Sequence, residues 1–119
     1  MGKKSIQLCL AALALCAAPS LAAGNQGNDG SVLLRMCKGA DKVRALSVMC
    51  HSYLNGYIDA ARHYGKTGKT GFCLEEGDKE KIPNALVDWI GAHPASQSQP
   101  AGAVLQQVLG ERFPCKGRK

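Results

Sequence analysis

The sequence contains few aromatic residues and no dense cluster of charge, and both shortages argue against nucleic-acid binding. Only six of its 119 residues are aromatic, one Trp, three Tyr and two Phe. Nucleic-acid-binding domains usually carry a basic stripe, often with aromatic side chains that stack on bases. Here the basic residues are spread along the chain, apart from a small group at Lys116, Arg118 and Lys119. We therefore expect no nucleic-acid partner.

Apolar runs long enough to cross a membrane are also missing, since a helix needs roughly 20 apolar residues to span a bilayer. The largely apolar stretch from Ile6 to Ala18 follows Lys3 and Lys4, and small residues at positions 22 and 23 suit signal peptidase. We interpret residues 1–23 as a cleavable secretory signal. The mature protein is then expected in the periplasm, without membrane insertion.

Cleavage changes how the six cysteines are interpreted. Removing the leader leaves about 97 residues, enough for one domain, with 13 Lys and Arg against 9 Asp and Glu. It also removes Cys9 and Cys16. An even set of cysteines in an oxidising compartment predicts two disulfides. The four that remain are Cys37, Cys50, Cys73 and Cys115.

Motifs for catalysis, metal binding or nucleotide binding are lacking. There is no Cys-x-x-Cys pair, no His-x-x-x-His pair and no Gly-x-Ser-x-Gly elbow, and paired cysteines leave no thiolate nucleophile. The GKTGKTG stretch at 65–71 resembles a phosphate-binding loop, but the glycine that this motif requires is replaced by His63 or Ala60. We expect no enzyme activity, no metal and no cofactor.

Apolar residues recur at spacings of three and four, which predicts an all-α domain. After a flexible segment at 24–30, Asn28 or Asp29 can cap a first helix. A second helix carries one apolar face, and the glycines of the 65–71 loop end it. The third helix either starts at Pro83, or is capped by Asp78 and kinked at Pro83, and a fourth follows the polar stretch 95–100. The expected apolar faces are Val32, Leu33, Met36 and Cys37; Leu46, Met49, Cys50, Tyr53, Leu54, Tyr57, Ile58 and Ala61; Ile82, Leu86, Trp89 and Ile90; and Ala101, Val104, Leu105, Val108, Leu109 and Phe113.

Short connections favour an antiparallel bundle of about four helices. Alternating helix directions bring Cys37 near Cys50, and Cys73 near Cys115, so we predict these two bridges. Gly56 interrupts the second helix at a cost of roughly 1 kcal/mol relative to alanine. We expect it to mark a close helix–helix contact beside Tyr53 and Tyr57, whose hydroxyls need partners or lie at an interface. Trp89 is expected in the core.

Taken in order, five segments resemble the Rap/Tai group of exported bacterial immunity proteins. The resemblance extends from about Val32 to Cys115, within a single helical domain at 31–119. The third helix departs from the group's pattern, because relatives keep an uninterrupted apolar helix where Pro83 stands here. The segments are LLRMC (33–37), CHSYLNGYIDA (50–60), FC (72–73), LVDWIGAHP (86–94) and FPC (113–115).

The resemblance implies a compact helical protein, often a homodimer, that neutralises a peptidoglycan amidase toxin of a type VI secretion system. Such amidases are cysteine–histidine hydrolases, so the catalytic chemistry would belong to the partner. In this group a loop between late helices blocks the toxin, and it corresponds here to positions 93–100. The implied partner-binding residues are His93, Pro94, Ser96, Gln97 and Gln99, and the structural motif includes Tyr53, Gly56, Tyr57, Trp89, Phe113 and Pro114.

A second interpretation is a small disulfide-bonded helical envelope protein with a stress or acid-chaperone role. Such a protein would lose structure in acid and bind unfolded clients. The chain has only three histidines and nine carboxylates to drive that change. Helicity and client aggregation measured from neutral pH downward separate the two interpretations.

Overall fold

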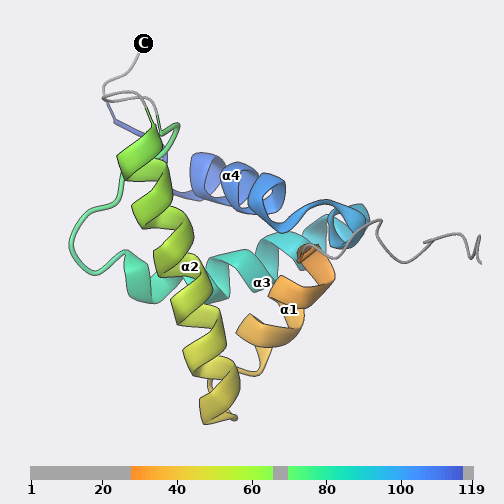
Figure 1. Ribbon diagram of the computed structural model, residues 1–119. Helices are drawn as coiled ribbons and strands as arrows, with labels where there is room; N and C mark the ends of the chain where they lie inside the picture. Colours follow the sequence, from red (N-terminus) through yellow and green to blue (C-terminus); the bar gives the residue numbers. More distant parts are fainter. Residues whose placement is uncertain (1–27, 66–69, 117–119) are drawn as a thin grey trace, which may run out of the picture.

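The computed structural model of the chain describes residues 28–65 and 70–116. The expected secretory signal, most of the 24–30 segment and residues 66–69 of the glycine-rich loop lie outside this part. Within it, four α-helices and two short 3-10 helices follow one another (Figure 1). They are α1 (Gly30–Lys38), α2 (Arg44–Tyr64), η2 (Lys79–Lys81), α3 (Ile82–Ala92), η3 (Pro94–Ser98) and α4 (Ala101–Arg112).

Helix α1 begins where the sequence predicted, because Asp29 caps it. The Asp29 carboxylate accepts a hydrogen bond from the backbone N–H of Val32 at 3.1 Å and another from the Ser31 hydroxyl at 2.6 Å. A carboxylate at this position satisfies one of the N–H groups that the first turn leaves without an intrahelical partner. Residues 28–30, expected as the end of a flexible segment, are therefore part of the folded domain.

Helix α2 is the longest element and ends at Gly65, as expected. The Gly65 N–H donates to the carbonyl of Ala61 at 2.8 Å. A Cβ atom at this position would collide with the same carbonyl, so the chain can turn out of the helix here only with glycine.

The two possible starts of the third helix are resolved in favour of the later one. A turn of 3-10 helix, η2, precedes α3, and α3 begins at Ile82 with Pro83 in its first turn. Proline is accepted there because first-turn N–H groups have no intrahelical acceptor, and its fixed φ suits a helix. Asp78 is therefore not the residue that caps α3.

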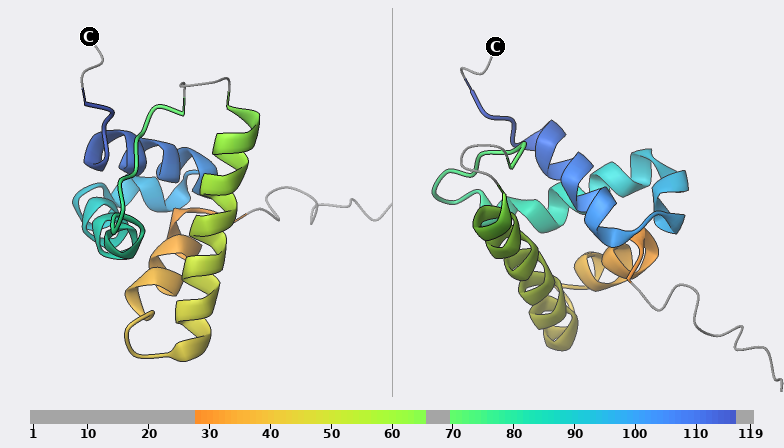
Figure 2. Two further views of the ribbon diagram at one scale, coloured as in Figure 1. Left: turned by 90° about the vertical axis from the view of Figure 1, so that its left-hand side faces the viewer. Right: turned by 45° about the horizontal axis from the view of Figure 1, so that its top comes forward.

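The core lies where α1 meets the other three helices. Leu33 of α1, Leu86 of α3 and Leu105 of α4 are fully buried. Helices α3 and α4 run antiparallel side by side, and α2 crosses them on the side that also holds α1 (Figures 1 and 2). The buried apolar residues are Leu33, Met36, Cys37, Cys50, Leu54, Ile58, Phe72, Ile82, Leu86, Trp89, Ile90, Ala101, Val104, Leu105, Val108 and Leu109.

Helix α2 contributes less to this core than its periodicity predicted. Only Cys50, Leu54 and Ile58 are buried, whereas Met49, expected on the same face, is 50% exposed. These three residues recur every four positions, which defines a narrow contact stripe. Met49 lies beyond the edge of that stripe, so the predicted apolar face was too wide.

Both predicted disulfides are present. Cys37 and Cys50 join the end of α1 to α2 with 5.1 Å between their Cα atoms. Cys73 and Cys115 join the segment after α2 to the segment after α4, with 4.8 Å between their Cα atoms. The first bridge is buried, whereas Cys73 is exposed and Cys115 half-buried.

This difference in burial predicts an order of reduction. A mild reductant applied to the native protein should free Cys73 and Cys115 first, because thiol–disulfide exchange requires access to sulfur. Opening their loop, which spans 42 residues, should lower the free energy of unfolding by about 4 kcal/mol. Alkylation followed by peptide mass spectrometry measures the order, and denaturant titration of the partly reduced protein measures the loss. Earlier labelling of Cys37 or Cys50 would contradict the prediction.

Candidate functional site

The segment between α3 and α4, predicted to contact a partner, is a short ordered turn. After His93 the chain forms the 3-10 helix η3. The N–H of Ser96 donates to the carbonyl of His93 at 2.9 Å, and the N–H of Gln99 donates to the carbonyl of Ser96 at 3.1 Å. Pro94 suits the first position of such a turn, where no N–H is needed.

The start of α1 holds this segment in place. The N–H of Gly30 donates to the carbonyl of Gln99 at 3.0 Å, and the N–H of Ala101 donates to the carbonyl of Asn28 at 3.0 Å. A Cβ atom at Gly30 would collide with the carbonyl oxygen of Ser96, so only glycine permits this approach. The two backbone stretches thus fix each other, and the turn lies against the body of the domain.

The His93 side chain is oriented by Trp89, one helical turn earlier. The two rings are stacked with centroids 4.0 Å apart and planes 18° apart. Nδ1 of His93 lies 2.8 Å from the carbonyl oxygen of Trp89. Because a carbonyl can only accept, Nδ1 is the donor in this contact.

Trp89 is itself held from α4. It is 2% exposed, as the sequence predicted for a core residue, and its Nε1 donates to Oε2 of Glu111 at 2.8 Å. No local spacing in the sequence indicates this bond, because the two residues are 22 positions apart. The hydrogen bond between Glu111 and Trp89 and the stacking of Trp89 on His93 therefore connect α4 to the start of the turn.

The five predicted contact residues are not equally accessible. His93 and Pro94 are exposed, and Gln97 and Gln99 are half-buried. Ser96 is 2% exposed, and its hydroxyl has no hydrogen-bond partner among the described residues. Of the five predicted residues, Ser96 is therefore the one whose side chain lies inside the domain.

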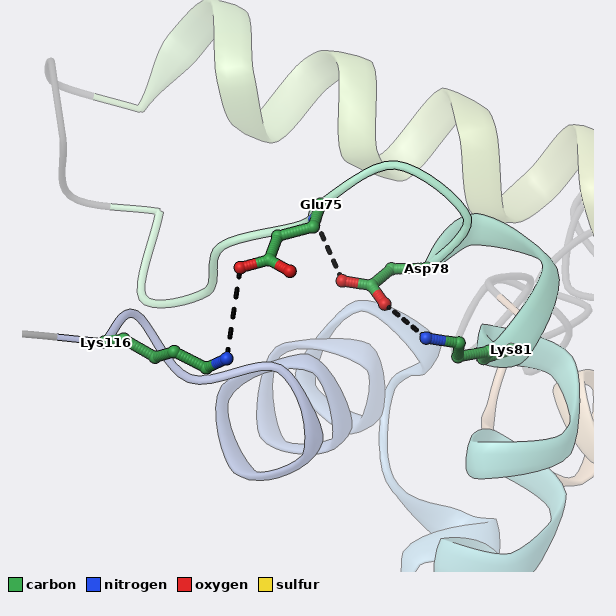
Figure 3. A network of polar contacts seen from close by, with 4 residues as sticks. All are labelled: Glu75, Asp78, Lys81 and Lys116. Carbon is green, nitrogen blue, oxygen red and sulfur yellow. Dashed lines mark hydrogen bonds and ion pairs between the residues drawn. The ribbon is translucent and has the colours of Figure 1, made fainter.

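A second polar surface is formed by Glu75, Asp78, Lys81 and Lys116 (Figure 3). The Asp78 carboxylate accepts from the backbone N–H of Glu75 at 2.9 Å and from Nζ of Lys81 at 2.9 Å. Nζ of Lys116 lies 4.0 Å from the Glu75 carboxylate. These groups border a hollow of about 530 Å³, which is lined by Cys73, Glu75, Asp78, Lys81, Arg112, Phe113, Pro114 and Lys116.

These hydrogen bonds change the ionisation of Asp78 and Lys81. The N–H of Glu75, followed by the Lys81 ammonium, holds the pKa of Asp78 below its ordinary value of 3.8. The same contact raises the pKa of Lys81 above 10.5. Sequence analysis expected Asp78 to cap a helix, whereas its side chain instead closes the turn that begins at Glu75. The exposed pairs add little stability.

The remaining motif residues divide between the domain and its surface. Phe113 is half-buried, and its carbonyl accepts from the N–H of Cys73 at 2.9 Å, while Pro114 is exposed. Tyr53 and Tyr57 are half-buried, and burial raises the pKa of Tyr57 above its ordinary value of 10. Gly56 is exposed, and apart from its two chain neighbours and the nearby backbone of its own helix, no described atom lies within 4 Å of a Cβ built there. The expected helix–helix contact at Gly56 is therefore not made within the described chain.

Three further features of the described residues concern metal binding, free thiols and membrane spans. In this part of the chain, no three His, Cys, Asp or Glu side chains are grouped so that they could hold a metal ion. All four of its cysteines are in disulfides. No described helix is long and apolar enough to cross a membrane. The segment at 93–100 is an ordered, partly exposed turn.

The chain matches a known protein family. The family model described as Rap1a immunity proteins matches residues 29–115. The matched region begins at Asp29, which caps α1, and ends at Cys115, the second cysteine of the more exposed bridge. Neither the curated proteins nor the solved structures contain a match to the chain.

The lowered pKa values of Asp29 and Asp78 predict how stability depends on pH. A carboxyl whose pKa is lower in the folded state stabilises the fold above its unfolded pKa, and this contribution is lost as pH falls through the folded value. We expect these two carboxyl groups to make a constant contribution to the free energy of unfolding at neutral pH. That contribution should decline below about pH 4. Asp78→Asn should remove part of that decline, with Glu76→Gln as the control. A decline beginning near pH 6 in urea titrations would contradict the prediction.

Proposed function

Because the chain belongs to the Rap1a immunity protein family, we propose that it is an exported inhibitor that binds and blocks a peptidoglycan amidase toxin of a type VI secretion system. Proteins of this family inhibit toxins. The amidase as target, the periplasm as compartment and a homodimer as the assembled form are further parts of the proposal. The family match over residues 29–115 is the observation that carries it.

Two properties of the chain support secretion into an oxidising compartment. The cysteines of the folded domain are joined in pairs, and such bridges persist in the periplasm but are rare in the cytosol. The first 23 residues have the charged start, apolar stretch and small residues of a secretory signal. An inhibitor must reach the compartment in which its toxin attacks the cell wall.

Inhibition in this proposal is steric, with the turn at 93–100 covering the toxin's cleft. The turn is short, hydrogen-bonded and joined to α1, so little conformational freedom is lost when it binds. His93 offers an oriented ring, Pro94 offers an exposed apolar surface, and Gln97 and Gln99 offer amides at the edge. The catalytic chemistry belongs to the toxin, and this chain excludes substrate.

The direct test uses a small amidase encoded beside the gene for this chain. Exporting the amidase to the periplasm of a test bacterium should lyse the cells, and co-export of this protein should protect them. Calorimetry with the purified pair should give one-to-one binding per protomer. Lysis despite co-export, together with no heat of binding, would contradict the proposal. Suppression of client aggregation at low pH would favour the chaperone role instead.

The turn is tested by His93→Ala. Loss of the stacked ring should raise the dissociation constant about 10-fold or more, as truncation of a central contact residue does. Glu76→Gln, which alters an exposed residue outside the turn, is the matched control and should bind like the wild type. Circular dichroism checks that both variants fold. Unchanged affinity of the His93 variant would exclude the turn from the interface while leaving toxin binding itself intact.

A further inference from the structure

The Cys73–Cys115 bridge borders an open hollow, whereas the Cys37–Cys50 bridge lies in the core. Cys73 is exposed and is one of the residues that line the hollow of about 530 Å³. Cys37 is 5% exposed and Cys50 is fully buried. Exchange between a thiolate and a disulfide requires that the thiolate reach one of the two sulfur atoms. Cys73 is therefore the cysteine that a small thiol reaches from solvent.

Positive charge predominates in this hollow. Three cations line it, Lys81, Arg112 and Lys116, against the two carboxylates of Glu75 and Asp78, which leaves a net charge of +1. Both oxygens of the Asp78 carboxylate are already bonded, one to Nζ of Lys81 and the other to the backbone N–H of Glu75, each at 2.9 Å. The charges of Lys81 and Asp78 therefore offset each other.

Arg112 and Lys116 are the cations that a ligand in the hollow would meet. No described carboxylate lies within 4.0 Å of the Arg112 guanidinium. Figure 3 shows the Lys116 ammonium reaching toward Glu75, but the two groups are 4.0 Å apart and the Lys116 side chain is 88% exposed. An exposed pair of this kind is weak. The Lys116 ammonium can therefore turn to an incoming anion.

We propose that Cys73 is a site of reversible S-thiolation by small thiols that carry a second negative charge. The thiolate attacks Sγ of Cys73, a new sulfur–sulfur bond forms there, and the bond to Cys115 breaks. The electron pair of the broken bond stays on Cys115, which leaves as a thiolate. One disulfide and one thiolate give one disulfide and one thiolate, so no further oxidant or reductant is consumed. This inference goes beyond toxin binding and does not depend on it.

The surroundings of the two sulfur atoms favour attack at Cys73 over attack at Cys115. Cys115 is half-buried and is not among the residues that line the hollow. Lys116 directly follows Cys115, whereas the first charged residue after Cys73 is the carboxylate Glu75. A nearby cation stabilises a thiolate, and a stabilised thiolate departs faster. Cys115 is therefore the better leaving group, and Cys73 the more accessible sulfur.

Contacts beside the bridge keep the two cysteines close together when the bond between them opens. The N–H of Cys73 donates to the carbonyl of Phe113 at 2.9 Å, and Phe72, the residue before Cys73, is 4% exposed in the core. The Cys115 thiolate therefore stays near the mixed disulfide. Such proximity speeds its attack on Cys73, which expels the added thiol and restores the bridge. The modification is reversible for this reason.

The test compares thiols of matched size on the oxidised, exported protein. The probes are 2-mercaptoethanesulfonate, 2-mercaptoethanol and cysteamine, whose thiolates carry two negative charges, one negative charge and no net charge. Each rate is taken per mole of thiolate and divided by the rate of the same thiol with bis(2-hydroxyethyl) disulfide. At low salt this ratio should rise about threefold for each added negative charge, and about 0.5 M NaCl should remove most of the increase.

Two substitutions test whether the hollow causes this preference. Arg112→Gln and Lys116→Gln change exposed residues, so both variants should fold, which circular dichroism checks. Each should slow the reaction of the sulfonate about threefold and leave that of cysteamine nearly unchanged. Arg44→Gln is the matched control and should react like the wild type. Arg44 is also an exposed cation, and Figure 1 shows the start of α2 at the opposite end of the molecule from the C-terminus.

Mass spectrometry identifies the cysteine that carries the added thiol. Acid quenching stops the exchange, because the thiolate is the nucleophile, and peptic peptides are then analysed. We expect the sulfonate on Cys73 and a free thiol at Cys115. An adduct mainly on Cys115 overturns the proposal, as do equal normalised rates for the three thiols or a preference that survives both substitutions. None of these measurements involves the toxin, so their failure leaves the proposed function intact.

Discussion

The attachment of α2 to the rest of the domain is the constraint on which the architecture depends. This helix of 21 residues buries only Cys50, Leu54 and Ile58, and the Cys37–Cys50 bridge joins its first half to α1. A stripe of three residues on one side leaves the opposite side of the helix in solvent. Because this contact is narrow, the Cys37–Cys50 bridge is important for holding α2 to the domain. The same narrow contact leaves a long surface of α2 exposed.

The remaining three helices form a more conventional core around α1, and this core positions the candidate contact turn. Leu33, Leu86 and Leu105 exclude water where α1, α3 and α4 meet, and the backbone of α1 pairs with the end of the turn. The hydrogen bond from Trp89 to Glu111 connects α3 to α4. The turn is therefore tied to the core by backbone hydrogen bonds. Rigidity matters for an inhibitor, because a surface that is already ordered loses little entropy on binding.

Local signals predicted much of this arrangement, and they failed at identifiable residues. The capping of α1 by Asp29 and the end of α2 at Gly65 depend on neighbouring residues, and both were predicted. Asp78 had the composition of a helix cap, but its carboxylate binds the N–H three residues before it, and α3 starts later. Met49 had the spacing of a core residue, but spacing gives the direction of a side chain and not the width of the surface that covers it.

The sequence by itself determined the helical class, the approximate helix positions, the cysteine pairing and the resemblance to an immunity family. These follow from periodicity, caps, chain direction and the order of motifs along the chain. Only the tertiary structure decided that Ser96 faces inward, that Glu111 holds Trp89, and that Gly56 has no partner within the described domain. Each of these depends on how distant elements approach each other in space, and a single sequence carries no local signal for that approach.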